Sequence, residues 1–94
     1  MRLVWTEPAL HDLASARDYI ALDSPSAAKR QVELILRAVD ILVRFPETGR
    51  PGRITGTREI VVGRTPYIIP YRLRDGTIEL LRVLHGRQRW PGAF

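Results

Sequence analysis

The chain has 94 residues, of which 45% are hydrophobic and 27% are charged, and this length and composition predict one globular domain over residues 1–94. Because the sequence contains no cysteine, disulfides, thiol nucleophiles and thiolate metal sites are excluded. No apolar run approaches the roughly 20 residues that a membrane-spanning helix needs, and Met1–Thr6 lacks the apolar segment of a secretion signal. We therefore expect a cytoplasmic protein that does not bind membranes.

The basic charge of the chain lies almost entirely in its second half. The formal net charge is +5, and 14 of the 15 cationic residues are arginine. Residues 1–49 hold six cations and seven acids, whereas residues 50–94 hold nine arginines and three acids. The planar guanidinium group suits phosphate and carboxylate partners. The charge therefore predicts a polyanionic partner, either a nucleic acid or an acidic protein segment, and does not separate the two.

The first predicted elements are a short strand and an amphipathic helix. Residues 2–6 alternate in polarity, with Leu3 and Trp5 on one face. Thr6 is suited to cap a helix, and Pro8 falls in the first turn, where its missing N–H costs no hydrogen bond. We expect this helix to end near Leu22. Its apolar stripe consists of Ala9, Leu13, Ala16 and Ile20.

A second helix is predicted directly after the first. Ser24 can cap it, Pro25 takes its first position, and Phe45-Pro46 ends it after about 18 residues. Two helices joined by so short a connection predict an antiparallel hairpin. The apolar stripe of this helix consists of Ala28, Val32, Ile35, Val39 and Leu42.

The second half of the chain changes to the period of β-structure. A loop rich in glycine, proline and arginine, residues 47–56, precedes a predicted strand over residues 58–62. A second strand is predicted over residues 67–73 and a return strand over residues 77–85. Between them, Asp75-Gly76 matches a type I′ hairpin turn.

Two further features of the second half are a proline inside the hairpin and a basic tail after it. Pro70 lacks an N–H inside the middle strand, which predicts a bulge or an unpaired position there. Residues 86–94 form a basic and aromatic tail. The element order is β-α-α-β-β-β, and the predicted fold is α+β, with an N-terminal helical hairpin packed on a small, mainly antiparallel sheet.

This order of elements carries a set of short motifs along nearly the whole chain. They are Trp5-Thr6 with Ala9 and Asp12-Leu13, Tyr19-Ile20, Pro25 with Ala27-Ala28, Leu42 with Phe45-Pro46, Gly49-Arg50, Gly56-Thr57-Arg58-Glu59, Pro66-Tyr67-Ile68-Ile69 with Tyr71-Arg72, and Leu81-Arg82-Val83-Leu84-His85-Gly86. Each motif is short, and their conjunction in this order and spacing is specific. In this combination the chain resembles the RelE/ParE superfamily of toxins.

The resemblance implies a toxin that is encoded beside an acidic antitoxin, whose C-terminal region wraps it. RelE-like members cut mRNA in the ribosomal A site, without a metal or another cofactor, and ParE-like members poison DNA gyrase. A shared fold does not decide between these targets. The first hypothesis is therefore ribosome-dependent mRNA cleavage, the alternative is gyrase inhibition without catalysis, and a third is a plain binding module or a degenerate toxin.

Three residues are candidates for catalysis in the nuclease hypothesis. Because histidine in general can exchange a proton near neutrality, His85 could act as an acid or a base, or it could pack at the end of its strand. Arg64 and Arg87 lie near positions where RelE-like members carry catalytic arginines. Against this hypothesis, the chain has a single lysine, and its tail lacks the tyrosine that some nuclease members use.

A second group of residues is expected to contact nucleic acid or the antitoxin, with a fall in antitoxin affinity as salt rises. It consists of Arg50, Arg53, Arg58, Tyr67, Arg82, Arg89 and Trp90. Arg58 and Arg82 are expected on neighbouring strands, where they could join on one sheet face. Core packing is the alternative for Tyr67, which shares a strand face with Tyr71. Glu59 could act as a base, but pairing with an arginine is favoured.

Overall fold

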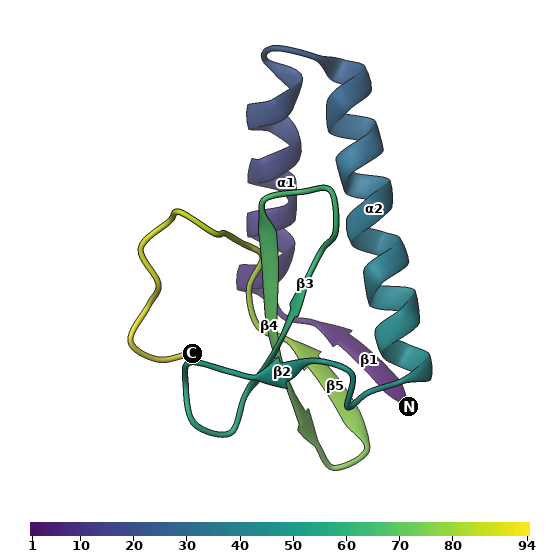
Figure 1. Cartoon of the computed structure of the whole chain (residues 1–94), viewed down its shortest axis with the longest axis vertical. Helices are drawn as coiled ribbons and strands as arrows, with labels where there is room; N and C mark the ends of the chain where they lie inside the picture. Colours follow the sequence, from purple (N-terminus) through teal and green to yellow (C-terminus); the bar gives the residue numbers. More distant parts are fainter.

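The computed structural model describes all 94 residues as a helical hairpin on one face of a six-stranded sheet (Figure 1). This arrangement confirms the α+β prediction. The elements are β1 (Arg2–Trp5), α1 (Glu7–Ala21), α2 (Pro25–Arg44), β2 (Arg50–Pro51), β3 (Arg58–Val61), β4 (Tyr67–Arg74), β5 (Thr77–Leu80) and β6 (Leu84–His85). No helix is both long and apolar enough to cross a membrane.

Both helices begin at the predicted capping residues. The hydroxyl of Thr6 accepts a hydrogen bond from the Ala9 N–H at 3.3 Å, and that of Ser24 accepts one from the Ala27 N–H at 3.1 Å. These bonds satisfy amide groups that the first turn of a helix leaves free. α2 ends at the Phe45 cap, so its predicted start and end are confirmed.

The sheet is mixed, with strand order β1-β5-β4-β3-β2 and with β6 paired to β4. β1 runs parallel to β5, and the other pairs are antiparallel. Because β4 separates β3 from β5, Arg58 and Arg82 do not lie on neighbouring strands, and that prediction was wrong. The short strand β2, inside the predicted loop, was also not expected.

The β4–β5 hairpin turns as predicted, but the return strand is interrupted. Asp75 and Gly76 have φ angles of 50° and 72°, as a type I′ turn requires. Tyr71 pairs with Leu80, and Ile68 pairs with Leu84, so the return side holds one residue more than β4 does. This bulge faces Pro70, which has no N–H to offer. The predicted bulge is thus confirmed, and the predicted continuous strand over residues 77–85 was wrong.

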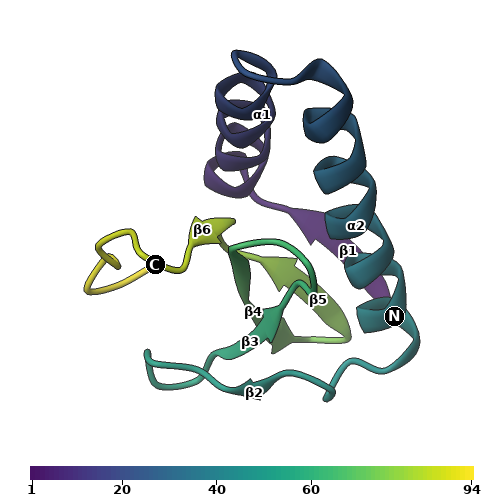
Figure 2. The ribbon, with the colours of Figure 1, turned by 45° about the horizontal axis from the view of Figure 1, so that its top comes forward.

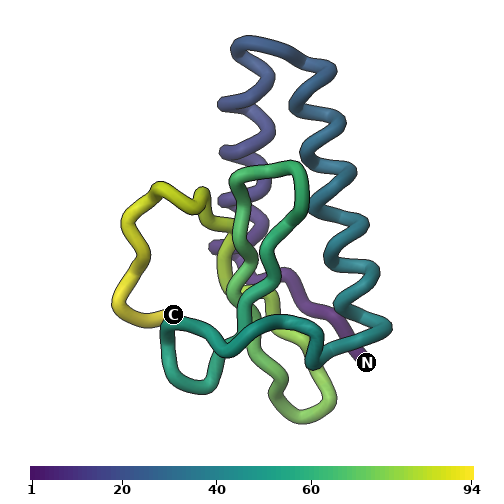
Figure 3. The backbone as a smooth tube through the Cα atoms, viewed as in Figure 1, coloured from purple at the N-terminus to yellow at the C-terminus, as the bar shows by residue number.

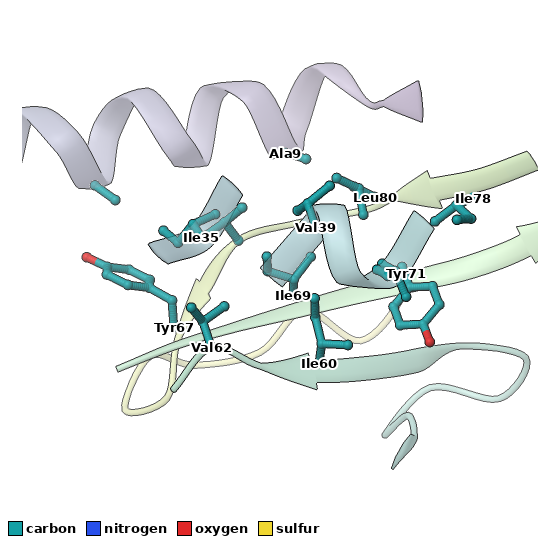
Figure 4. Packing of buried hydrophobic residues seen from close by; sticks show 13 residues of the cluster. Ala9, Ile35, Val39, Ile60, Val62, Tyr67, Ile69, Tyr71, Ile78 and Leu80 are labelled. Carbon is teal, nitrogen blue, oxygen red and sulfur yellow. The ribbon is translucent and has the colours of Figure 1, made fainter. Parts of the chain in front are cut away.

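The main core lies between the helices and the sheet (Figure 4). Tyr67 and Tyr71 are both part of it, so the core alternative that was considered for Tyr67 is confirmed. The Tyr71 hydroxyl also donates to the Pro46 carbonyl at 2.7 Å and accepts from the Gly49 N–H at 2.9 Å. These two bonds fix the segment that follows α2 against the sheet. Figure 2 shows that no helix covers the opposite face.

Candidate functional site

The three candidate catalytic residues lie at one end of the sheet, where β4 begins. His85 pairs with Tyr67 in the ladder, and the Gly86 N–H donates to the Pro66 carbonyl at 2.8 Å. This bond joins the turn between β3 and β4, which carries Arg64, to the start of the tail, which carries Arg87. The fold therefore gathers these residues from segments about 20 positions apart in the sequence, as tertiary packing commonly does.

The imidazole ring of His85 contacts the ring of Tyr67 and the backbone of Arg87. The His85 ring packs edge-on against Tyr67, with 5.7 Å between ring centroids and 82° between ring planes. Its Nδ1 atom accepts a hydrogen bond from the Arg87 N–H at 3.1 Å, and its own N–H donates to Gln88 Oε1 at 3.0 Å. Since Nδ1 is an acceptor, the neutral ring carries its proton on Nε2.

A shallow depression of about 390 Å³ lies beside His85 and α1. Burial raises the pKa of the Tyr67 hydroxyl, and the nearby Tyr19 raises it further. Tyr67 therefore stays protonated near neutrality and can donate a hydrogen bond but cannot accept a proton. The lining consists of Asp12, Ser15, Ala16, Tyr19, Tyr67, Val83, His85 and Gln88.

Arg64 occupies a strained position in the β3–β4 turn. Its φ angle is 64°, in the left-handed region that residues with a Cβ adopt at a cost. Arg64, Arg87 and Arg89 are exposed, and none of them forms an ion pair within the chain. Their charges remain available to a partner.

Arg82, in contrast, is held inside the protein by Asp12 of α1. Its Nε and Nη2 atoms donate to the Asp12 carboxylate at 2.6 and 3.0 Å, and the Val83 N–H donates to the same carboxylate at 2.9 Å. The bond from Asp12 raises the pKa of Arg82 further above its ordinary value. Asp12 thus secures the bulged segment between β5 and β6. Sequence reasoning did not assign Asp12 a role, and no local pattern in the sequence marks it as the partner of Arg82.

Arg58 is likewise occupied within the chain. Its Nη1 atom donates to the carbonyl groups of Glu47 and Gly49 at 3.2 and 3.0 Å. These bonds attach the segment after α2 to the start of β3. The predicted contact of Arg58 and Arg82 with a polyanion stays a prediction, and both side chains have structural partners that it would have to displace.

Glu59 is paired, as the favoured interpretation predicted. Its side chain is only 2% exposed, and its carboxylate accepts bonds from Arg50 Nε and Nη2 at 3.2 and 3.1 Å. The same carboxylate accepts the Arg53 N–H at 2.9 Å, and Arg53 Nε lies 4.0 Å from it. A buried carboxylate held in this way organises the arginine-rich loop.

Arg53 also joins this loop to the C-terminal tail. Its guanidinium lies 3.9 Å from the centre of the Trp90 ring, a cation–π contact. The tail therefore returns toward the loop between β2 and β3. Figure 3 shows the C-terminal end of the chain beside that loop. Trp90 was expected to stack on a base, close the core or meet the antitoxin, and here its ring is covered by Arg53. The residues described contain no cluster of three or more carboxylate, histidine or cysteine groups that could hold a metal.

Comparison with known proteins gives a consistent set of relatives. A family model described as the ParE toxin of the type II toxin–antitoxin system parDE matches residues 3–90. The chain is 50% identical over 91 residues to the candidate toxin Y4kP of Sinorhizobium fredii, which covers 96% of this chain and 93% of that protein. It is 43% identical over 84 residues to toxin RelE2 of Caulobacter vibrioides, covering 89% and 93% of the two chains.

A solved structure described as a chromosomal ParDE toxin–antitoxin system from P. aeruginosa has the same fold. The TM-score is 0.81 at 33% sequence identity, and the match covers 90% of this chain and 95% of the other. The chain therefore belongs to the ParE toxin family, within the RelE/ParE superfamily, and is a toxin of a type II toxin–antitoxin system.

Proposed function

We propose that this toxin arrests growth by binding DNA gyrase, as ParE-like members do, and that it catalyses no reaction of its own. The match to the ParE family supports this proposal. The single observation that carries it is the hydrogen bond from the Arg87 N–H to Nδ1 of His85. This bond decides which ring nitrogen is available for proton transfer.

A ribonuclease that activates the 2′-hydroxyl of RNA by general base catalysis uses a group that accepts a proton. With Nδ1 accepting the Arg87 N–H, the neutral ring of His85 already carries a proton on Nε2 and has no lone pair there. A second proton would have to enter at Nδ1, where it would face the Arg87 N–H. The contact with the Arg87 N–H thus favours His85 as a hydrogen-bond donor over His85 as a base, which supports the proposal.

The other titratable side chains around the candidate site do not replace His85. Tyr67 has a raised pKa and remains protonated near neutrality. The carboxylate of Asp12 is bound by Arg82 and by the Val83 N–H. The carboxylate of Glu59 is buried under two arginines. None of these groups pairs with His85 as an acid and base would.

Ribosome-dependent mRNA cleavage, the first hypothesis from the sequence, is the second candidate. One observation favours it, namely the gathering of Arg64, His85 and Arg87 at one end of the sheet. The name of the Caulobacter relative, RelE2, points in the same direction. A nuclease in which positioning and arginine charge replace the base would use this arrangement.

We further propose that the antitoxin binds the apolar groove between α2 and β3. The groove has a volume of about 340 Å³, and Ile41 and Val61 on its walls are 54% and 56% exposed. Arg50 lies at its margin and offers a charge to an acidic segment. Because β2 pairs only with Arg58 and Glu59, the edge of β3 at Val61 is open to an added strand.

The target is tested by inducing the toxin in a bacterial host and measuring gyrase-linked DNA breaks and mRNA 5′ ends in the same culture. We expect DNA breaks with intact mRNA. His85→Gln removes the imidazole ring from the candidate site, and His11→Gln, on the exposed side of α1, is the matched control. Both variants should stay toxic. Codon-registered mRNA cuts that disappear only in His85→Gln would refute gyrase poisoning and establish the nuclease.

A further inference from the structure

The sheet face opposite the helices carries rows of arginine side chains. The strand register places Arg2, Thr77 and Arg74 side by side across β1, β5 and β4. The next row holds Val4, Glu79 and Arg72. Because directly paired residues point to the same side of a sheet, both rows lie on the face that no helix covers (Figure 2).

The arginine-rich loop extends this charged surface past β3. Arg50 pairs with Glu59 across β2 and β3, and Arg53 reaches the same carboxylate. We name this surface the arginine face. It consists of Arg2, Arg50, Arg53, Arg72 and Arg74, together with Glu59 and Glu79.

Two carboxylates orient four of the five arginines without neutralising them. Glu59 lies 3.1 Å from Arg50 and 4.0 Å from Arg53. Glu79 lies 2.8 Å from Arg72 and 3.7 Å from Arg74 on the neighbouring strand. Each carboxylate is thus shared by two guanidinium groups, and Arg2 has no ion pair at all. The arginine face keeps a positive excess and holds its guanidinium groups in defined positions, as phosphate recognition favours.

We propose that the arginine face docks on the phosphate backbone of duplex DNA, so that the toxin holds the DNA on which its target acts. This inference rests on gyrase as the target. The charge of the face is complementary to DNA, and backbone contacts of this kind need no base recognition. No helix covers this face, the groove proposed for the antitoxin meets it at Arg50 and Glu59, and the end of the tail lies at its margin beside Arg72 and Arg74.

The residue types on the arginine face favour duplex DNA over other polyanions as its ligand. Single-stranded nucleic acids are usually held by exposed aromatic rings on which bases stack. None of the residues that the register places on this face is aromatic. At its margin, Arg53 covers one face of the Trp90 ring, and the single ring of Phe94, 37% exposed, lies beside Arg72 and Arg74. An acidic protein segment would need apolar anchors. Val4, 38% exposed, is the one exposed apolar side chain in the two arginine rows, whereas the α2–β3 groove offers several.

The test measures binding of the purified full-length toxin to a fluorescent DNA duplex of about 20 base pairs, with mixed sequence, over a range of salt concentrations. The variant is Arg2→Gln with Arg74→Gln, since Arg2 has no ion pair and Arg74 has only the longer, 3.7 Å contact with Glu79. The matched control is Arg30→Gln with Arg37→Gln, which removes the same charge from the exposed side of α2. Thermal unfolding confirms that both variants are folded.

Each phosphate contact that is lost lowers the salt slope of the binding constant by about 0.9. Two lost contacts mean that raising salt from about 50 to 200 mM weakens the variant roughly 12-fold less than the natural chain. The control should keep the natural slope. Equal slopes in the variant and the control, or tighter binding to single-stranded RNA than to the duplex, would overturn the proposal.

Gyrase-linked cleavage in the same variants separates this inference from the proposed function. We expect Arg2→Gln with Arg74→Gln to poison gyrase at least several-fold less than the control does. If the variant loses duplex binding but poisons gyrase as well as the natural chain, the arginine face does not hold the target's DNA. If no form of the toxin produces gyrase-linked breaks while duplex binding depends on the arginine face, gyrase fails as the target and the DNA contact stands.

Discussion

Asp12→Asn should cost far more stability than the loss of a surface carboxylate on a helix usually does. The Asp12 carboxylate accepts two bonds from Arg82 and one from the Val83 N–H, and the side chains of Asp12 and Arg82 are 12% and 27% exposed. Breaking a buried ion pair typically costs about 3–5 kcal/mol. The partial exposure of Arg82 screens its charge, so we expect a loss of about 2–3 kcal/mol in the free energy of unfolding.

For a chain of this size, such a loss lowers the midpoint of thermal unfolding by about 10–20 °C. Urea and thermal unfolding of the purified toxin measure both quantities. Asp18→Asn is the matched control, because Asp18 also lies on α1 and pairs with an arginine, but both side chains are exposed. We expect the control to change stability by at most about 0.5 kcal/mol. If Asp12→Asn costs no more than Asp18→Asn does, the argument that Asp12 secures the bulge is refuted.

Three further expectations concern the loop, the tail and the arginine face. Gly49→Ala should destabilise the fold by about 1–3 kcal/mol in urea unfolding, because the new Cβ would lie 2.5 Å from the Tyr71 hydroxyl oxygen. Arg53→Ala removes the cation–π contact with Trp90 and should speed tryptic cleavage of the tail, whereas Arg53→Lys should restore part of the protection. The Arg72 hydrogen bond lowers the pKa of Glu79 in the folded state, so Glu79 stabilises the fold above its unfolded pKa and loses this effect as pH falls through the folded pKa. Glu79→Gln should therefore reduce stability at neutral pH more than at acid pH, and it should tighten duplex DNA binding.

The parts of the fold that follow from neighbouring residues were predictable from the sequence. Thr6 and Ser24 cap their helices because a hydroxyl at that position can accept an amide of the first turn. Asp75-Gly76 forms the turn because both residues tolerate a positive φ. Pro70 predicted the bulge because it removes one donor from the ladder. Each of these signals acts over a few residues.

The parts that depend on distant segments were not predictable in the same way. The pair of Asp12 and Arg82 joins positions 70 residues apart, and no local pattern marks either residue for the other. The contact of Arg53 with Trp90 depends on how the tail returns to the loop. The candidate site was likewise predictable only in part. Its residue types were visible in the sequence, but the bond that fixes the His85 ring appeared only in the structure.

The position of Arg50 connects the two binding surfaces that we propose. Arg50 lies on the margin of the α2–β3 groove and is also part of the arginine face, where it binds Glu59. An acidic segment seated in the groove would compete with Glu59 for Arg50 and would bring negative charge beside the arginine face. The strength of a phosphate contact depends on the electrostatic potential around it. Antitoxin binding in the groove should therefore weaken DNA binding even if the antitoxin does not cover the arginine face. By linkage, DNA should weaken the binding of the antitoxin segment by the same factor. If the two ligands oppose each other in this way, the toxin would need no separate switch, because release from the antitoxin would itself restore its affinity for DNA.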